Sequence, residues 1–354
     1  MLFVVDLPPD ILSGIRRSLV EERVRELLYA HRLGRCLLVV ERDSYNWITK
    51  HIKLSGVDRA TLEKIYNSLA QTGRLRRDAT SYIRIAGPSN PLKRINEREI
   101  SVPLDYQLFG NILMNPALVV EDAKYDVAIY RSIYSNIECR PGGYPTSYDP
   151  VHGGGSRIAD ITDGQIGAQR IVCAVIDSDK KSPFCPSTKR DDLLAGVAQP
   201  NWPLLFVFEL PCSEIENLVP IDIYVAILDL NKLEIAQTLL KIIASENTGG
   251  PNSTQSISMF YDIKKGVSWT SFDKLANDQA RDWIRTKLSI YYDLRGEFVV
   301  PGFGSHALGR LIDHPRFESA FRSRIPTREW QEAFGQFFSS VYWILMAANP
   351  QYAL

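Results

Sequence analysis

The order of apolar and polar positions divides the chain into helical and extended stretches. Apolar residues recur about every 3.6 positions over residues 8–33, a spacing that predicts an amphipathic helix. The apolar run 36–40 predicts a strand, and residues 60–71 again follow the helical period. Residues 73–105 are polar, with no element predicted, and we place a domain boundary near 100–110.

Beyond this boundary, short apolar runs alternate with helical patterns. The predicted strands cover residues 117–120, 171–176 and 204–210, and the predicted helices cover 124–136 and 157–169. Buried strands that alternate with helices are typical of a parallel sheet covered on both faces. We therefore expect an α/β protein in three parts: an N-terminal α/β region (1–105), a parallel-sheet domain (106–225) and a mostly helical C-terminal region (226–354).

Composition and charge exclude several classes of protein. The 354 residues include 41 Lys and Arg and 41 Asp and Glu, so the net charge is zero and a strongly basic nucleic-acid binder is disfavoured. A nuclease remains compatible, because metal ions or a partner can supply the phosphate contacts. The five cysteines form no CxxC pair, which disfavours a zinc ribbon or a disulfide framework and fits the cytoplasm. Neither a signal peptide nor a membrane-spanning stretch is predicted.

Acidic residues follow two of the predicted buried strands. Asp177 and Asp179 come directly after 171–176, and Glu121 comes directly after 117–120. The carboxyl ends of parallel strands form one edge of the sheet, where such folds bind ligands. A hard divalent cation such as Mg²⁺ prefers carboxylate ligands and relieves their repulsion. The alternatives are a capping pair in a loop for the two aspartates and a helix-start acid for Glu121.

A segment similar to residues 118–126 occurs earlier in the chain. The sequence LVVERDSYN at 38–46 resembles LVVEDAKYD at 118–126, with Glu41 in the place of Glu121. Only Glu121 is close enough along the chain to share a compact strand–helix–strand unit with Asp177. We therefore interpret Glu41 as structural or as part of a degenerate second half.

Four motifs together resemble the Toprim domain, the metal-binding module of topoisomerases, primases and OLD-type nucleases. They are LVVEDAKYD (118–126), HGGGS (152–156), CAVIDSDKK (173–181) and LPCSEIENLVP (210–220). The EIEN-like motif after the fourth strand is similar to that of OLD-type and related antiphage Toprim effectors. The resemblance covers roughly residues 110–225 and implies a Toprim-like parallel sheet flanked by helices.

The resemblance also implies a site for one or two Mg²⁺ or Mn²⁺ ions. The ligands that it implies are Glu121, Asp126, Asp177, Asp179 and Glu216. The chain departs from the family pattern at two points. Many members have glycine after the glutamate, where this chain has Asp122 after Glu121. The next acid usually comes four residues after the glutamate, whereas Asp126 comes five residues after Glu121. The resemblance does not decide which of Glu121, Asp122 and Asp126 lies outside the direct metal ligands. It also leaves open whether Glu214 or Glu216 is the additional acid that such nucleases use.

Other chemistry-bearing residues lie outside these motifs. In OLD-type nucleases a lysine beyond the core stabilises charge at the phosphate, and the resemblance assigns this role to Lys264 or Lys265, for which a solvated basic turn is the alternative. His152 adjoins the glycine turn and is a weaker candidate for the metal site. The glycine loop at 301–306 lacks the GK[ST] ending of a phosphate-binding loop.

The expected function is therefore a metal-dependent Toprim endonuclease that cleaves DNA or RNA in bacterial antiphage defence. Because no nucleotide-hydrolysis motif occurs, an ATPase or sensor would have to be a partner protein, as the resemblance implies; a homo-oligomer is left open. The alternative is a non-catalytic Toprim-like regulatory subunit, which would be free to lose its acids. Strand passage and primer synthesis are disfavoured, because no nucleophilic tyrosine domain or zinc module accompanies the core.

Overall fold

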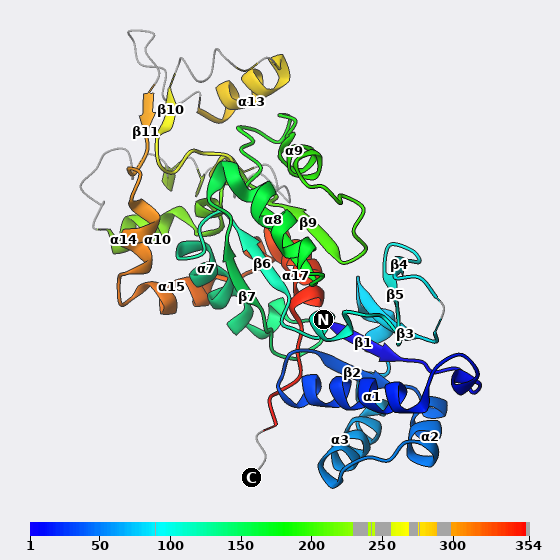
Figure 1. Ribbon diagram of the computed structural model, residues 1–354. Coiled ribbons are helices and arrows are strands. Elements are labelled where there is room, and N and C mark those ends of the chain that lie inside the picture. Colours follow the sequence, from blue (N-terminus) through cyan, green and yellow to red (C-terminus); the bar gives the residue numbers. More distant parts are fainter. Residues whose placement is uncertain are drawn as a thin grey trace.

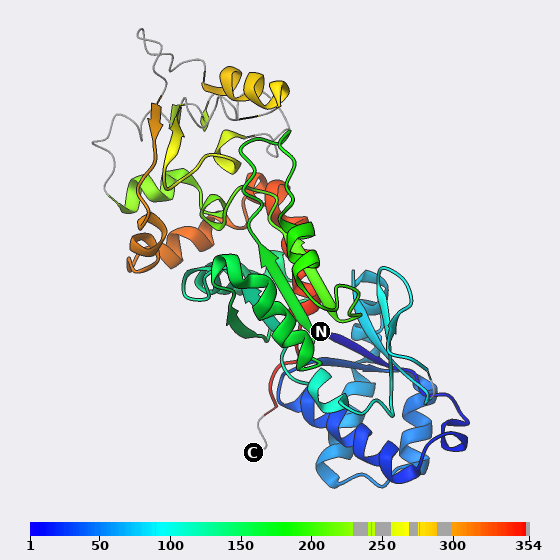
Figure 2. The same ribbon diagram turned by 45° about the horizontal axis from the view of Figure 1, so that its top comes forward.

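The chain forms an elongated molecule in which two sheets and a group of helices follow one another (Figures 1 and 2). The computed structural model describes residues 1–88, 90–228, 240–241, 243–244, 256–268, 275, 277–288 and 299–351. The N-terminal sheet lies at one end, a second sheet occupies the middle, and most C-terminal helices lie at the other end. The α/β class, with parallel sheets flanked by helices and a helical C-terminal region, is confirmed.

The N-terminal sheet has the strand order β2-β1-β3-β5-β4. Its strands are β1 (Leu2–Val5), β2 (Leu37–Val40), β3 (Tyr82–Ala86), β4 (Lys93–Arg94) and β5 (Glu99–Pro103). All neighbours pair in parallel except β4, which runs antiparallel to β5. The helices that accompany it are α1 (Arg17–Arg32), α2 (Arg42–His51), α3 (Gly56–Asn67), α4 (Leu69–Thr72), α5 (Leu75–Asp78) and α6 (Phe109–Ile112).

Two sequence expectations for this region were wrong in detail. The helix expected over 8–33 begins only at Arg17, after a short 3-10 helix, because the chain bends where Gly14 packs against Pro88. A Cβ atom at Gly14 would lie 2.9 Å from the Pro88 ring, so a larger residue there would require one of the two segments to shift. The polar stretch 73–105 contains β3 and β5, whose alternating isoleucine and valine positions are fully buried.

The second sheet is entirely parallel and has the strand order β7-β6-β8-β9. Its strands are β6 (Ala117–Val120), β7 (Asp149–His152), β8 (Val172–Ile176) and β9 (Leu205–Glu209), and its helices are α7 (Tyr125–Ser135), α8 (Ile158–Gly167) and α9 (Lys189–Gly196). The strands β6, β8 and β9 lie within one residue of the predicted apolar runs. Every residue of β6 and β8 is buried, as expected for central strands covered on both faces, whereas the edge strand β9 is partly exposed at its carboxyl end.

Alternate residues of these strands enter two separate apolar cores. Val119, Ala174 and Ile176 pack with residues of α8 and α9 on one face. Leu118 and Val175 face a larger core, which extends into the N-terminal sheet and the C-terminal helices. The second sheet is thus fixed from both sides, which holds its carboxyl edge in place.

The C-terminal region covers the second sheet and completes that larger core. Its described helices are α10 (Ile221–Ile227), α13 (Asp278–Leu288), α14 (Ala307–Ile312), α15 (Phe317–Arg324), α16 (Arg328–Trp330) and α17 (Gln336–Leu345). The strands β10 (Gly266–Ser268) and β11 (Val299–Pro301) form a separate antiparallel pair, with α13 between them in the chain. The aromatic helix α17 is core rather than a surface, since Phe338 and Tyr342 are fully buried and Phe338 contacts α7.

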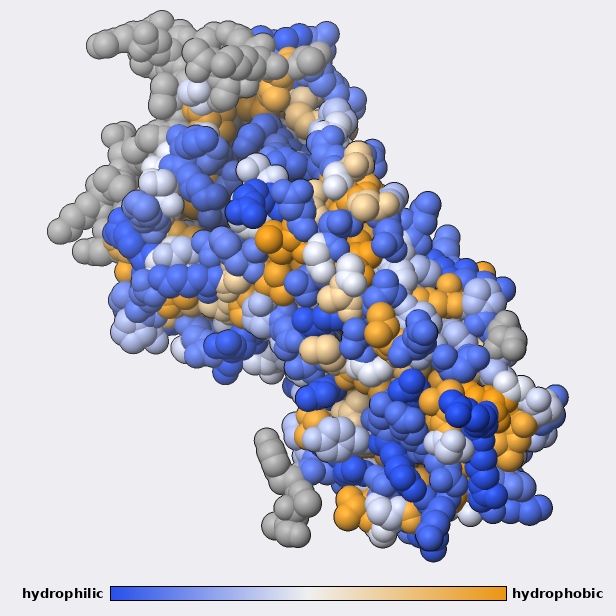
Figure 3. All heavy atoms as spheres, in the orientation of Figure 1, coloured by the Kyte–Doolittle hydropathy of each residue, from blue (hydrophilic) through white to orange (hydrophobic). Residues whose placement is uncertain are grey.

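The face shown in Figure 3 is predominantly hydrophilic, with apolar side chains in small groups. No helix in the described ranges is long and apolar enough to cross a membrane.

Candidate metal centre

The residues that follow β6 and β8 lie side by side at the carboxyl edge of the second sheet. The two strands pair directly, with Val119 opposite Ala174. Glu121 and Asp177 therefore leave neighbouring strands at the same edge. Beside them is a cavity of about 310 Å³, which is lined by Glu121, Asp122, Tyr125, Asp126, Asp177, Ile215, Glu216, Lys264, Ser305, His306, Leu308 and Gly309.

Asp177 is a carboxyl group in a poorly solvated part of the cavity. Its Oδ1 atom accepts a hydrogen bond from the backbone N–H of Ile215, at 3.0 Å. Burial raises the pKa of Asp177 well above its usual value, and the nearby carboxylates of Glu121, Asp126 and Glu216 raise it further. Such a group binds a proton or another cation strongly, because its ionised form is poorly solvated and surrounded by like charge.

The β6–α7 turn places two further acids in the cavity. Burial raises the pKa of Glu121, and the negative charge of Asp179 adds to the effect while Lys189 opposes it. Asp126 is 6% exposed, and its Oδ2 atom accepts a hydrogen bond from the backbone N–H of Asp122, at 2.9 Å. Burial raises the pKa of Asp126 to about 7. The two acids therefore share the poorly solvated environment of Asp177.

The glycine turn at 152–156 holds the backbone of Glu121 in place. The N–H of Gly153 donates to Val120 and that of Gly154 donates to the carbonyl of Glu121, at 2.7 and 3.2 Å. A Cβ atom at Gly153 would lie 2.8 Å from the Val120 carbonyl, so only glycine permits this approach. His152 itself does not line the cavity; its Nδ1 atom accepts a hydrogen bond from the Ala123 backbone.

Asp179 does not join Glu121 and Asp177 in the cavity, contrary to the expected triad. Its backbone is left-handed, with φ of 53°, and its N–H is bonded to the carbonyl of Ser213. The Asp179 carboxylate lies 2.5 Å from the ammonium of Lys189 and is about half exposed. The ion pair with Lys189 thus occupies the Asp179 carboxylate outside the cavity lining, while its charge still raises the pKa of Glu121.

The EIEN loop (Glu214–Asn217) contains both candidates for the additional acid, and only one of them lines the cavity. Glu216 is 4% exposed and lines the cavity, whereas Glu214 lies just outside its lining. Asn217 fixes the loop, because its side-chain amide donates to the carbonyls of Ser258 and Tyr261, both at 2.8 Å. The Oε2 atom of Glu216 is buried and has no hydrogen-bond partner among the described residues.

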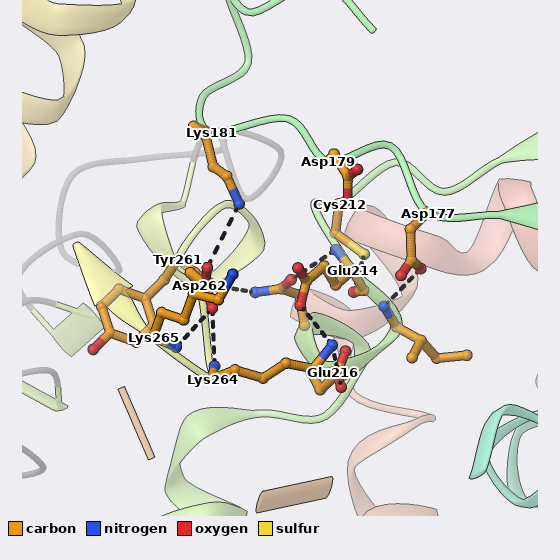
Figure 4. Close-up of polar contacts among 12 residues, drawn as sticks. Asp177, Asp179, Lys181, Cys212, Glu214, Glu216, Tyr261, Asp262, Lys264 and Lys265 are labelled. Carbon is orange, nitrogen blue, oxygen red and sulfur yellow. Dashed lines mark hydrogen bonds and ion pairs between the residues drawn. The ribbon is translucent and has the colours of Figure 1, made fainter. Parts of the chain in front are cut away.

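Lys264 enters this cavity from the C-terminal region (Figure 4). Its ammonium lies 2.9 Å from Glu216 Oε1 and 3.1 Å from Glu214 Oε2. Burial alone lowers the pKa of Lys264, but the two glutamates outweigh burial and raise it above the usual value. The Lys265 side chain is not part of the cavity lining, so the structure places only the first of the two candidate lysines at the site.

The donor chemistry fits a hard divalent cation, although the side chains do not form a closed ligand set. In the part of the chain that the structure describes, no three His, Cys, Asp or Glu side chains are grouped closely enough to hold a metal ion. The cavity nevertheless contains carboxyl groups whose pKa values are raised by burial, and the Oε2 atom of Glu216 has no hydrogen-bond partner among the described residues. Carboxylates are the ligands that Mg²⁺ and Mn²⁺ prefer. Binding would therefore require side-chain rotation within the cavity.

Sequence reasoning missed two polar residues of the lining, Ser305 and His306, which precede α14. They belong to the glycine loop 301–306, whose only signal in the sequence was its unusual composition. Glu41, in contrast, starts α2 at the edge of the N-terminal sheet, where it lies 3.4 Å from Arg76. The structure thus separates the two similar LVVE segments into different sheets.

Comparisons with known proteins give no independent assignment of this chain. No protein-family model matches it, and neither does any curated protein or solved structure. The function must therefore be argued from the motifs and from the geometry of the acidic cavity.

Proposed function

We propose that this protein is a Mg²⁺- or Mn²⁺-dependent endonuclease of Toprim type. It would hydrolyse phosphodiester bonds of DNA or RNA in the cytoplasm as an effector of bacterial antiphage defence, with an ATPase or sensor protein as its partner. The proposal is supported above all by one observation: the carboxyl groups of Glu121, Asp126, Asp177 and Glu216 surround one cavity at the carboxyl edge of a parallel sheet.

The energetics of the cavity favour cation binding. Burial and mutual repulsion raise the pKa values of all four carboxyl groups, so each of them is costly to ionise without a cation. An acidic cluster of this kind is difficult to explain by stability alone, because buried like charges destabilise a fold. Proteins retain such groups where they are needed for function.

Each residue has a defined part in the proposed reaction. Glu121, Asp177 and Glu216 would hold the metal, and Asp126 would orient the β6–α7 turn through its bond to Asp122. When bound, the metal would lower the pKa of water and stabilise the charge of the leaving oxygen. Lys264 would contact the phosphate, where a fixed ammonium stabilises the charge that develops in the transition state.

One observation favours a non-catalytic regulatory subunit instead. Lys264 is paired with both glutamates of the EIEN loop, and Lys189 is paired with Asp179. These ion pairs neutralise part of the acidic site without a metal. A non-catalytic subunit would need no further positive charge to stabilise these acids, so metal binding must be tested directly.

Metal binding and cleavage can be tested on the same protein preparation. Thermal melts in EDTA, Mg²⁺, Mn²⁺ and Ca²⁺ should show stabilisation of the wild type, because a ligand that binds only the native state raises its stability by mass action. Plasmid DNA and structured RNA should be cleaved with Mg²⁺ or Mn²⁺ and not with EDTA. Asp177→Asn should lose both effects. Equal metal stabilisation of the wild type and of this variant, or cleavage that persists in EDTA, would contradict the proposal.

A further inference from the structure

Lys264 is the one Lys or Arg among the described residues that line the acidic cavity, and five acidic residues belong to the same lining. Its ammonium spans Glu214 and Glu216, at 3.1 and 2.9 Å. The distance to Glu216 is to its Oε1 atom, and its Oε2 atom is buried without a hydrogen-bond partner among the described residues. The lysine therefore neutralises a carboxylate of the proposed metal site that has few other partners.

The backbone that carries this lysine is fixed from several directions. The N–H groups of Lys264 and Lys265 both donate to Asp262 Oδ1, at 3.0 and 2.8 Å (Figure 4). The carbonyl of Lys264 accepts from Gly304, at 3.0 Å. Gly302 packs so closely that a Cβ atom there would lie 2.4 Å from the Lys264 carbonyl group. Any displacement of the ammonium must therefore occur by rotation of the side chain.

A second cation at Glu216 would change the position of the lysine. A divalent ion bound by the Glu216 carboxylate would lie close to the Lys264 ammonium, and two cations on one carboxylate repel each other. The flexible four-carbon stem of lysine permits the ammonium to move, whereas the rest of the EIEN loop is held by Asn217.

We propose that Lys264 is the internal counter-ion of the metal-free site and that a divalent metal competes with it for Glu216. Metal binding releases the ammonium from the two glutamates, and the released ammonium becomes available to a substrate phosphate. This inference rests on the proposed function, since it assigns to that site a coupling between metal loading and phosphate binding. It accounts for the coexistence of a lysine ion pair and an unsatisfied carboxylate oxygen on one residue.

The first test measures metal affinity in the absence of substrate. Calorimetric titration of MnCl₂ into Lys264→Met should show binding that is about tenfold tighter than in the wild type, within the range of about 5- to 150-fold for coupled ligands. Lys264→Arg, which retains the charge, should bind as the wild type does. Lys265→Met is the matched control, because Lys265 occupies the same turn but its side chain is not in the cavity lining.

The second test uses the wild-type protein and needs no folded variant. Acetylation of lysines with a mild reagent, followed by mass spectrometry, should modify Lys264 slowly in EDTA, because its ammonium is held by two carboxylates. Saturating Mg²⁺ or Mn²⁺ should increase the rate at Lys264 several-fold and leave the rate at Lys265 unchanged.

The possible results separate this inference from the proposed function. If neither metal stabilises the wild type or binds to it, the proposed metal centre itself is wrong. If the wild type binds metal while Lys264→Met binds with equal or lower affinity, the competition is refuted. If that variant does not fold, the acetylation result decides: a rate at Lys264 that metal leaves unchanged or lowers overturns the inference.

Discussion

Replacing Asp126 with asparagine should stabilise the metal-free protein, by an amount that increases with pH. The Asp126 side chain is buried, and its Oδ2 atom accepts a hydrogen bond from the Asp122 backbone. Asparagine has a carbonyl oxygen that can accept the same bond, so Asp126→Asn removes the charge and retains the contact. What it removes is the cost of ionising a carboxyl group beside Glu121 and Glu216.

The sign and the size of this effect follow from the raised pKa. The carboxyl group titrates at about 7 in the folded protein, against an ordinary value of 3.8. Between these two pH values the folded protein retains a proton that the unfolded chain has lost, so stability falls as the pH rises. Each pKa unit corresponds to about 1.4 kcal/mol, and the shift of roughly three units sets an upper limit of ~4 kcal/mol above pH 7. From pH 5.5 to pH 8, the variant should gain about 2 kcal/mol relative to the wild type.

Urea unfolding in EDTA at pH 5.5 and pH 8.0 measures this difference. Asp179→Asn is the matched control, because Asp179 is about half exposed and pairs with Lys189 outside the cavity. Loss of this exposed ion pair should cost up to about 1 kcal/mol at both pH values. The reasoning would be refuted if Asp126→Asn were destabilising at pH 8.0, or if its effect were the same at the two pH values.

Three further predictions follow from the site. Glu121→Ala should abolish metal-dependent cleavage, whereas Glu41→Ala, in the similar segment of the N-terminal sheet, should leave cleavage largely intact. Equal loss of cleavage in the two folded variants would contradict the choice of Glu121 as a metal ligand. Lys264→Met should reduce turnover at saturating substrate about 100-fold or more, whereas Lys265→Met should not. If Lys264→Met only weakens substrate binding, to the extent that added salt weakens it in the wild type, Lys264 has no catalytic role. Gly302→Ala should lower the free energy of unfolding by about 1–3 kcal/mol, because the new Cβ atom would overlap the backbone of Lys264. An unchanged urea midpoint would show that the turn rearranges without loss of stability.

The sequence was sufficient to predict the part of the site that depends on local signals. The strands β6 and β8 are unbroken apolar runs, and such runs are recognisable because both faces of a parallel sheet are buried. Chain length between Glu121 and Asp177 then allowed one compact unit, in which the two acids meet at one edge. The strands of the polar stretch 73–105 were missed, because each has only two alternate Ile or Val positions, too few to stand out in a polar segment.

The rest of the site depends on contacts that no local pattern reveals. Asp179 has a left-handed backbone and pairs with Lys189 outside the cavity lining, and neither feature is evident from a DSD motif. The position of Lys264 depends on the C-terminal region, which folds back and is tied to the EIEN loop through Asn217. His306 reaches the cavity in the same way, by the packing of a distant segment against α7.

The most direct test of the proposed metal centre is anomalous diffraction from crystals soaked in Mn²⁺. The account predicts a manganese peak inside the acidic cavity, with Asp177 and Glu216 oxygens at about 2.0–2.3 Å from the ion, as expected for a hard cation bound by carboxylates. It also predicts that the Lys264 ammonium has moved away from Glu216. A cavity without such a peak at a Mn²⁺ concentration that supports cleavage, or a peak bound only by residues outside this cavity, would contradict the account.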